Sequence, residues 1–289
     1  MRPHQWSKNA LLAVIPFLNL SDPDGIWVVW LLLSFLAFSF VASALYIVND
    51  MVDVDADRNH PTKRNRPFAK GDLTTLEGII LTSVLGMMGF AFSLTLSVDF
   101  SLMLLAYAAI SAIYTFHLKW IPILDTMILS LMYCWRVLSG GVLIEANINY
   151  WFMLAMGAFF LALALGKRAM ELYNNQDSDK LAKMRGYVAK DLYVVIASGI
   201  SSSFLCVVIV LIYALLSKSA VIENQISAVI VVSILIFWQT RFWLLVGRGE
   251  VHEDPIVFAL KDRLTLAITI ILGLVVIYEQ LWSQNLYQF

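Results

Sequence analysis

Residues 26–58 of the chain read IWVVWLLLSFLAFSFVASALYIVNDMVDVDADR. The first 24 of them, 26–49, are almost entirely apolar. As a helix rising ~1.5 Å per residue, this run is long enough to cross the ~30 Å hydrocarbon core of a bilayer. Four aspartates follow within eight residues, and Arg58 ends the stretch. The stretch therefore predicts a membrane helix whose end carries a regular series of acids.

The composition of the whole chain agrees with this prediction. Of the 289 residues, 60% are hydrophobic and 14% are charged, and the mean hydropathy is +0.76. Soluble domains contain roughly 45–50% apolar and about 25% charged residues, so a soluble globular protein and a disordered chain are excluded. The apolar runs are continuous, which disfavours a β-barrel, whose strands alternate. We expect an all-α integral membrane protein with a single domain over residues 1–289. About nine membrane helices are expected, at 9–20, 26–49, 74–97, 99–117, 121–143, 149–167, 191–217, 223–246 and 264–283.

Basic residues gather on one side of this topology. With nine spans, 18 of the 20 Lys and Arg residues fall on the side of the N-terminus, against Lys218 alone on the other side and Arg136 within a span. By the positive-inside rule, the first side is cytoplasmic. Long charged loops are predicted only there. We therefore expect the active site in a polar cavity that faces the cytoplasm from the inner (cytoplasmic) membrane.

The acids at the end of the second span have the spacing of one helix face. Asp53 is four residues from Asn49, three from Asp50 and four from Asp57, so a helix that continues past position 49 would place them on one face. Stacked carboxylates repel one another unless a cation lies between them, and oxygen ligands of this kind suit Mg²⁺. We predict a Mg²⁺ site at these four residues, with Asp55 solvated on another side. A solvated acidic helix end is the alternative.

Cations follow the acids directly. Arg58, Lys63 and Arg66 are candidates to hold the phosphates of a polyanionic substrate, whereas membrane anchoring explains Arg64 and Lys70. A second basic cluster begins where the sixth span ends. There, Lys167, Arg168 and Glu171 are expected to form a phosphate-binding helix end, with a snorkelling interfacial pair as the alternative.

Two charges lie inside the fifth predicted span. An unpaired charge in a membrane costs at least ~2.5–3.5 kcal/mol, so Asp125 and Arg136 each need a polar environment. On one helix they share a face but are ~16 Å apart at ~1.5 Å per residue, too far for a direct pair. We expect both to line the polar cavity; a purely structural role for Arg136 is the alternative.

Several motifs together resemble the UbiA superfamily of intramembrane prenyltransferases, and within it the branch of decaprenyl-phosphate phosphoribosyltransferases. They are Arg-Pro-His-Gln-Trp-Ser-Lys-Asn at 2–9, Asn-Asp-x-x-Asp-x-x-x-Asp-Arg at 49–58, the basic run at 60–67, and Gly-Lys-Arg-x-x-Glu-Leu at 166–172. Aromatic prenyltransferases of the superfamily carry a second Asp-x-x-x-Asp motif after the sixth span. Here that loop contains Asp177, Asp179 and Asp191 without that spacing.

The resemblance implies a transferase that moves 5-phosphoribose from phosphoribosyl pyrophosphate to a polyprenyl phosphate of the decaprenyl type. Pyrophosphate would leave with the help of Mg²⁺. The catalytic residues would be Asp50, Asp53, Asp57, Lys167 and Arg168. Substrate binding would involve Gln5, Lys8, Asn9, Tyr46, Asn49, Arg58, Lys63, Arg66, Asp125, Arg136, Glu171 and Tyr187.

Two other functions deserve comparison. A UbiA-type aromatic prenyltransferase would consume polyprenyl diphosphate and would not carry ribose into the lipid. A transporter is disfavoured, because the charges gather at one membrane face and no inverted repeat is visible. No nucleic-acid partner is expected, and a homo-oligomer stays open. Replacing Asp50 or Asp53 with Asn is expected to abolish transfer while leaving stability nearly intact.

Overall fold

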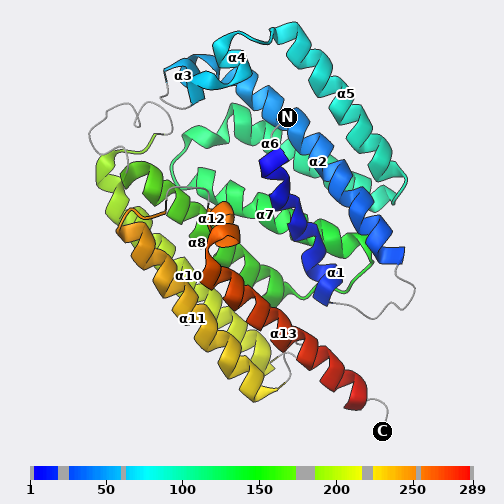
Figure 1. The fold of residues 1–289 in the computed structure, drawn as a ribbon, viewed down its shortest axis with the longest axis vertical. Helices are drawn as coiled ribbons and strands as arrows, with labels where there is room; N and C mark the ends of the chain where they lie inside the picture. Colours follow the sequence, from blue (N-terminus) through cyan, green and yellow to red (C-terminus); the bar gives the residue numbers. More distant parts are fainter. Residues whose placement is uncertain are drawn as a thin grey trace. The chain divides into compact units, whose positions relative to one another are not determined.

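The computed structural model describes residues 3–18, 26–59, 63–173, 186–216, 224–251 and 255–286. Within these ranges the chain is built from helices and their connections, without a strand (Figure 1). Seven of the described helices are long and apolar enough to cross a membrane. They are α2 (Ile26–Val52), α5 (Thr75–Leu94), α6 (Val98–Phe116), α7 (Leu124–Leu143), α8 (Tyr150–Tyr173), α10 (Leu192–Leu216) and α11 (Gln225–Gly247). The expected all-α, multi-pass membrane protein is confirmed.

The first and last expected spans are not among these seven helices. The N-terminal one is replaced by a 3-10 helix, η1 (Pro3–Ala13), which continues as the short α1 (Val14–Leu18). The last lies within α13 (Arg263–Leu286), whose 24 residues would extend ~36 Å at ~1.5 Å per residue. That length is sufficient for a crossing, but the total of nine spans stays a prediction.

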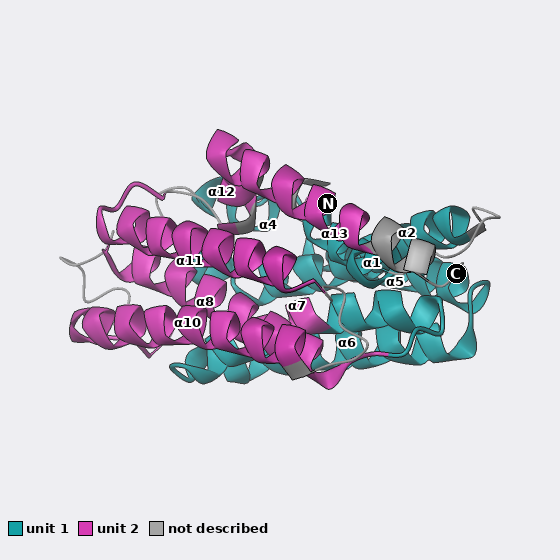
Figure 2. Ribbon diagram, turned by 90° about the horizontal axis from the view of Figure 1, so that it is seen from below, with its two compact units in different colours: residues 1–128, 135–147 teal, residues 129–134, 148–289 magenta. Residues whose placement is uncertain are grey.

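The chain forms two compact units, coloured separately in Figure 2. Unit 1 comprises residues 1–128 and 135–147, and unit 2 comprises residues 129–134 and 148–289. In unit 1, α2 packs against α5, α6 and η1. In unit 2, α8 packs against α10, and α11 packs against α10 and α13. The single domain expected over residues 1–289 stays a prediction.

Glycine allows η1 to lie directly against α7 in unit 1. A Cβ atom built on Gly140 of α7 would lie 2.0 Å from the backbone oxygen of Leu12 in η1. No side chain fits in that space, and small residues are the usual means by which membrane helices approach closely. The N-terminal segment is therefore packed backbone to backbone against the interior of unit 1.

The acid-rich segment after α2 continues in a nearly helical conformation, as the sequence predicts. Asp53 is a turn residue, and α3 (Val54–Arg58) follows it. Helical hydrogen bonding persists across the turn, because the Asp53 amide donates to the Asn49 carbonyl at 3.0 Å and the Asp57 amide donates to the Asp53 carbonyl at 2.8 Å. Further along the chain, η2 (Lys63–Asn65) and α4 (Pro67–Lys70) precede α5 and pack against α3. The fold thereby brings the basic run back to the acids.

Candidate active site

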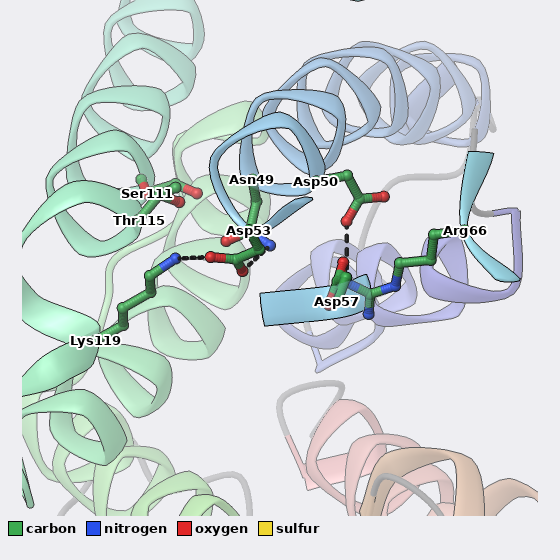
Figure 3. Close-up of polar contacts among 8 residues, drawn as sticks. All are labelled: Asn49, Asp50, Asp53, Asp57, Arg66, Ser111, Thr115 and Lys119. Carbon is green, nitrogen blue, oxygen red and sulfur yellow. Dashed lines mark hydrogen bonds and ion pairs between the residues drawn. The ribbon is translucent and has the colours of Figure 1, made fainter. Parts of the chain in front are cut away.

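The three acids at the end of α2 divide between two cations, and with Asn49 they form two pairs of side chains (Figure 3). Asp50 and Asp57, which are 8% and 2% exposed, both accept hydrogen bonds from Nη1 of Arg66, at 3.2 and 2.6 Å. Asp53 accepts hydrogen bonds from Nζ of Lys119 at 2.5 Å and from Nδ2 of Asn49 at 3.0 Å.

The single face predicted for the four side chains is therefore corrected to two adjacent stripes. Positions 50 and 57 are seven residues apart, or nearly two full turns at ~3.6 residues per turn, and positions 49 and 53 are four apart. Consecutive residues 49 and 50 point ~100° apart, so the two pairs separate around the helix. Asp55 points away from both pairs and lies exposed, with an ion pair to Arg58 at 3.3 Å.

A cavity of about 410 Å³ lies beside Asp50 in unit 1. Three of the predicted substrate-binding residues, Tyr46, Lys63 and Arg66, also line it. Asp125 and Arg136 do not. The full lining consists of Ser43, Tyr46, Ile47, Asp50, Lys63, Asn65, Arg66, Pro67, Phe68, Leu73 and Leu81. One charged group of α2 and two cations of the following segment thus meet around a space large enough for part of a substrate.

The Asp50 and Asp57 pair fits a divalent cation. Their carboxylate oxygens converge on one nitrogen of Arg66, so they can converge on one hard cation in the same way. Among the described residues, no group of three or more His, Cys, Asp and Glu side chains could hold a metal ion. Mg²⁺ does not require such a group, because it is usually bound by one or two carboxylates, with waters and substrate phosphates completing the shell. Metal binding by Asn49 and Asp53 stays a prediction.

Lys119 is a candidate site residue that the sequence analysis missed. It lies in η3 (Leu118–Trp120), directly after α6, and is buried beside Asp53. Sequence analysis counts it only among the cations of the cytoplasmic face. The available signal was its isolation: it is the one charged residue between Asp99 and Asp125, in a connection too short to be a solvated loop.

The N-terminal segment is tied into the interior of unit 1 by a buried polar network. Nδ2 of Asn9 donates to Oγ of Ser39 on α2 at 3.0 Å, and Oδ1 of Asn9 accepts from Nε of Arg136 on α7 at 3.0 Å. Arg136 also donates from Nη2 to the hydroxyl of Tyr107 at 2.6 Å. This geometry favours the structural alternative for Arg136 and Asn9. Lys8 is also buried, and the side chain of Gln5 lies outside the described residues.

The second basic cluster, in unit 2, divides between two functions. Arg168 is 1% exposed, makes an ion pair with Glu171, and places its guanidinium carbon 5.3 Å from the centre of the Tyr187 ring. Lys167 is half-buried and projects ~100° away around the helix. The geometry thus favours a structural function for Arg168, which holds Glu171 and Tyr187 in place. Lys167 is the better candidate to bind phosphate.

The remaining acids after α8 do not form a second acid motif in the described part of the chain. Asp191 accepts a hydrogen bond from the amide of Val188 at 2.9 Å and so stabilises the turn before α10. Asp177 and Asp179 lie outside the described residues. Their function therefore stays open.

Another ion pair in unit 2 links α11 to Asp262, the residue that precedes α13. Arg241 on α11 donates from both terminal nitrogens to Asp262, at 2.7 and 3.0 Å. Asp262 also accepts from the amide and hydroxyl of Thr265, at 3.0 and 2.7 Å. Burial raises the pKa of Asp262, but the hydrogen bonds from Arg241 and Thr265 outweigh it and hold the pKa below its ordinary value. This arrangement joins α11 to α13 at one end.

The chain is similar in sequence to several known proteins. The chain is 35% identical over 266 residues to the uncharacterized protein y4nM of Sinorhizobium fredii, covering 91% of this chain and 52% of that protein. It is 31% identical over 279 residues to the nodulation protein NoeC of Azorhizobium caulinodans, covering 94% and 89%. A decaprenyl-phosphate phosphoribosyltransferase of Mycobacterium tuberculosis is 36% identical over 177 residues, covering 60% and 59%. The chain thus spans little more than half the length of two of these three relatives.

Solved structures show the same fold at low sequence identity. A UbiA homolog from Archaeoglobus fulgidus bound to GPP and Mg²⁺ superposes with a TM-score of 0.72 at 16% identity, covering 96% of this chain and 95% of that one. The model of the UbiA prenyltransferase family matches residues 10–261. The chain therefore belongs to the UbiA prenyltransferase family.

Proposed function

We propose that the protein transfers 5-phosphoribose from phosphoribosyl pyrophosphate to a polyprenyl phosphate of the decaprenyl type. One observation carries the proposal: Asp50 and Arg66 line the cavity, and Asp57 shares Nη1 of Arg66 with Asp50. Carboxylates for a divalent cation beside a guanidinium for phosphate oxygens are what a phosphorylated donor requires. The phosphoribosyltransferase relatives support the same reaction.

The reaction makes modest demands on the protein. A phosphate oxygen of the acceptor is already anionic at pH 7, so no strong base is needed. It forms a bond to C1 of the ribose while the bond from C1 to the pyrophosphate oxygen breaks, and pyrophosphate leaves. Catalysis must stabilise the charge that develops on pyrophosphate and hold the reactants in line.

Asp50, Asp57 and Arg66 meet these demands in the proposal. The two carboxylates would hold Mg²⁺, which supplies positive charge to the departing pyrophosphate. Arg66 and Lys63 would bind phosphate oxygens, and Lys119 would fix the position of Asp53. Lys167 is proposed to bind a second phosphate, either the 5-phosphate of the donor or the phosphate of the acceptor.

A second candidate function is prenyl transfer from a polyprenyl diphosphate. It is favoured by the fold match to the homolog that binds GPP and Mg²⁺. The two reactions differ in what enters the lipid. We also propose that the site faces the cytoplasm, because the basic residues are predicted to lie on that side.

The decisive experiment uses the full chain in lipid nanodiscs with ribose-labelled phosphoribosyl pyrophosphate, Mg²⁺ and decaprenyl phosphate. Label is expected in the lipid fraction, and Asp50→Asn or Asp57→Asn should abolish its transfer. The matched control is Asp55→Asn, because Asp55 belongs to the same acidic run but is exposed. Lipid without label, combined with consumption of a polyprenyl diphosphate, would refute phosphoribosyl transfer in favour of prenyl transfer.

A further inference from the structure

The N-terminal segment and α2 are joined by two hydrogen bonds in matching register. Nε1 of Trp6 donates to Oγ of Ser43 at 3.0 Å, and Nδ2 of Asn9 donates to Oγ of Ser39 at 3.0 Å. The two donors are three residues apart on η1, which is ~6 Å at the ~2.0 Å rise of a 3-10 helix. The two serines are four residues apart on α2, which is also ~6 Å at ~1.5 Å per residue. The 3-10 form of η1 therefore lets one of its faces meet one face of α2.

Ser43 differs from Ser39 in what else it faces. Both residues are 0% exposed, but only Ser43 lines the cavity beside Asp50. With Tyr46, Ile47 and Asp50, it forms the face of α2 that borders the cavity. Ser43 is seven residues from Asp50, or ~10 Å along the helix at ~1.5 Å per residue. A ligand that contacts both residues must therefore extend along α2, away from its acid-rich end.

The hydroxyl group of Ser43 has a hydrogen to donate to a ligand. A serine hydroxyl carries one hydrogen and two lone pairs, and Nε1 of Trp6 donates to one of these lone pairs. Ser34, on the same helix, donates its hydrogen to the carbonyl of Leu31 at 2.8 Å. Within the described part of the chain, the Ser43 hydroxyl has no such acceptor. A buried donor without an acceptor is costly, so an oxygen atom of a bound ligand would stabilise it.

We infer that Ser43 binds a ribose hydroxyl group of the sugar donor and that Trp6 is the residue that positions Ser43. The inference rests on the proposed function for the identity of the donor. Phosphate groups bind best to cations, whereas the neutral hydroxyl groups of ribose suit the neutral hydroxyl of Ser43. An isoprene chain has no oxygen to accept this hydrogen bond. Because a site built for a hydroxyl group discriminates against a ligand that lacks one, Ser43 makes the cavity selective for a sugar donor over a prenyl donor.

Ligand binding tests the inference without turnover. The full chain in nanodiscs with Mg²⁺ is titrated with phosphoribosyl pyrophosphate, with its 2-deoxy and 3-deoxy analogues, and with inorganic pyrophosphate. Ser43→Ala should weaken binding of phosphoribosyl pyrophosphate about tenfold and leave binding of pyrophosphate unchanged. The analogue that lacks the bound hydroxyl group should bind equally to the parent protein and to Ser43→Ala. If the substitution weakens both analogues as much as phosphoribosyl pyrophosphate, or weakens none of the ligands, the inference is wrong.

Two further variants separate the cavity hydroxyl from the docking of η1. Ser39→Ala is the matched control, because Ser39 is equally buried on α2 and bonded to η1 but does not line the cavity. It should keep the affinity of the parent protein for phosphoribosyl pyrophosphate. Trp6→Phe removes the indole N–H and keeps an aromatic ring, so it should weaken donor binding less than Ser43→Ala does. The double variant should bind like Ser43→Ala, since Trp6 acts through Ser43, and additive losses would refute the positioning function.

Ribose transfer by the parent protein separates failure of this inference from failure of the proposed function. If the parent transfers ribose but Ser43→Ala raises the KM for phosphoribosyl pyrophosphate no more than Ser39→Ala does, only the inference about Ser43 fails. A parent protein that transfers no ribose and binds a polyprenyl diphosphate more tightly than phosphoribosyl pyrophosphate would refute both.

Discussion

The buried ion pair between Asp53 and Lys119 changes the expected effect of Asp53→Asn on the stability of the protein. The sequence alone predicts that this substitution abolishes transfer and leaves stability nearly intact. In the structure, however, the carboxylate that it removes is the partner of an ammonium group whose side chain is only 4% exposed. Asp53→Asn should therefore destabilise the protein as well as inactivate it.

The two partners of this ion pair should not be equivalent. Removing one partner of a buried pair costs ~3–5 kcal/mol, because the remaining charge stays buried without compensation. Asp53→Asn leaves the Lys119 ammonium in that position, so its cost should lie in this range. Lys119→Met leaves the Asp53 carboxylate, which is 20% exposed and keeps its hydrogen bond from Asn49. Its cost should be smaller, ~1–3 kcal/mol.

Thermal and denaturant unfolding of the purified protein in one detergent would measure both costs, and the double variant completes the cycle. Because Met and Asn together leave no unpaired charge, the double variant should be more stable than Asp53→Asn alone. Asp55→Asn serves as the control for loss of an exposed acid and should change stability little. If Asp53→Asn is as stable as this control, or if the two costs simply add, the ion pair does not carry the energy assigned to it.

Two further predictions concern the packing of each unit. Gly140→Ala should destabilise unit 1 by ~1–3 kcal/mol, because its Cβ would lie 2.0 Å from the Leu12 oxygen. Gly86→Ala, on α5 with nothing within 4 Å, should leave the melting temperature unchanged or raise it. In unit 2, Asp262 has a pKa below the ordinary value of ~3.9, so its ion pair with Arg241 stabilises the fold fully above that pH and loses its effect as the pH falls through the lowered pKa. Melting temperatures measured from pH 7 to pH 3 should thus fall less for Asp262→Asn than for the parent, and parallel curves would contradict this assignment.

The spans could be predicted from the sequence because they depend on a local property. A run such as residues 26–49 must be a helix in a bilayer, since each backbone polar group needs a partner within the segment. The N-terminal segment was harder to predict, because its helix type depends on contacts with distant residues. Gly140 and Ser39 on other helices fix it, and nothing in residues 9–20 indicates those partners.

The sequence could predict which acids belong to the candidate site, but not which cation binds each of them. The spacing of Asp50, Asp53 and Asp57 correctly indicated where the acids gather, because a helix imposes it. Which cation binds which acid depends on where α4 and η3 return, and that information is not local. Lys119 was missed for this reason. Arg168 was predicted as a phosphate ligand from its charge and its place at the end of an apolar helix, whereas its burial against Tyr187 depends on the chain that follows α8.

The charges around the acids indicate how metal and phosphate would bind there. Three aspartates face two cations, Arg66 and Lys119, so the cluster carries one net negative charge when all are ionised. If Asp50 and Asp57 bound a divalent ion alone, Arg66 would lose both anionic partners while still largely covered by protein, which is costly. A phosphate that arrives with the ion gives the guanidinium new acceptors. The cations that compete with the metal for the carboxylates are therefore the same groups that can hold the phosphate, so each ligand should bind more tightly in the presence of the other.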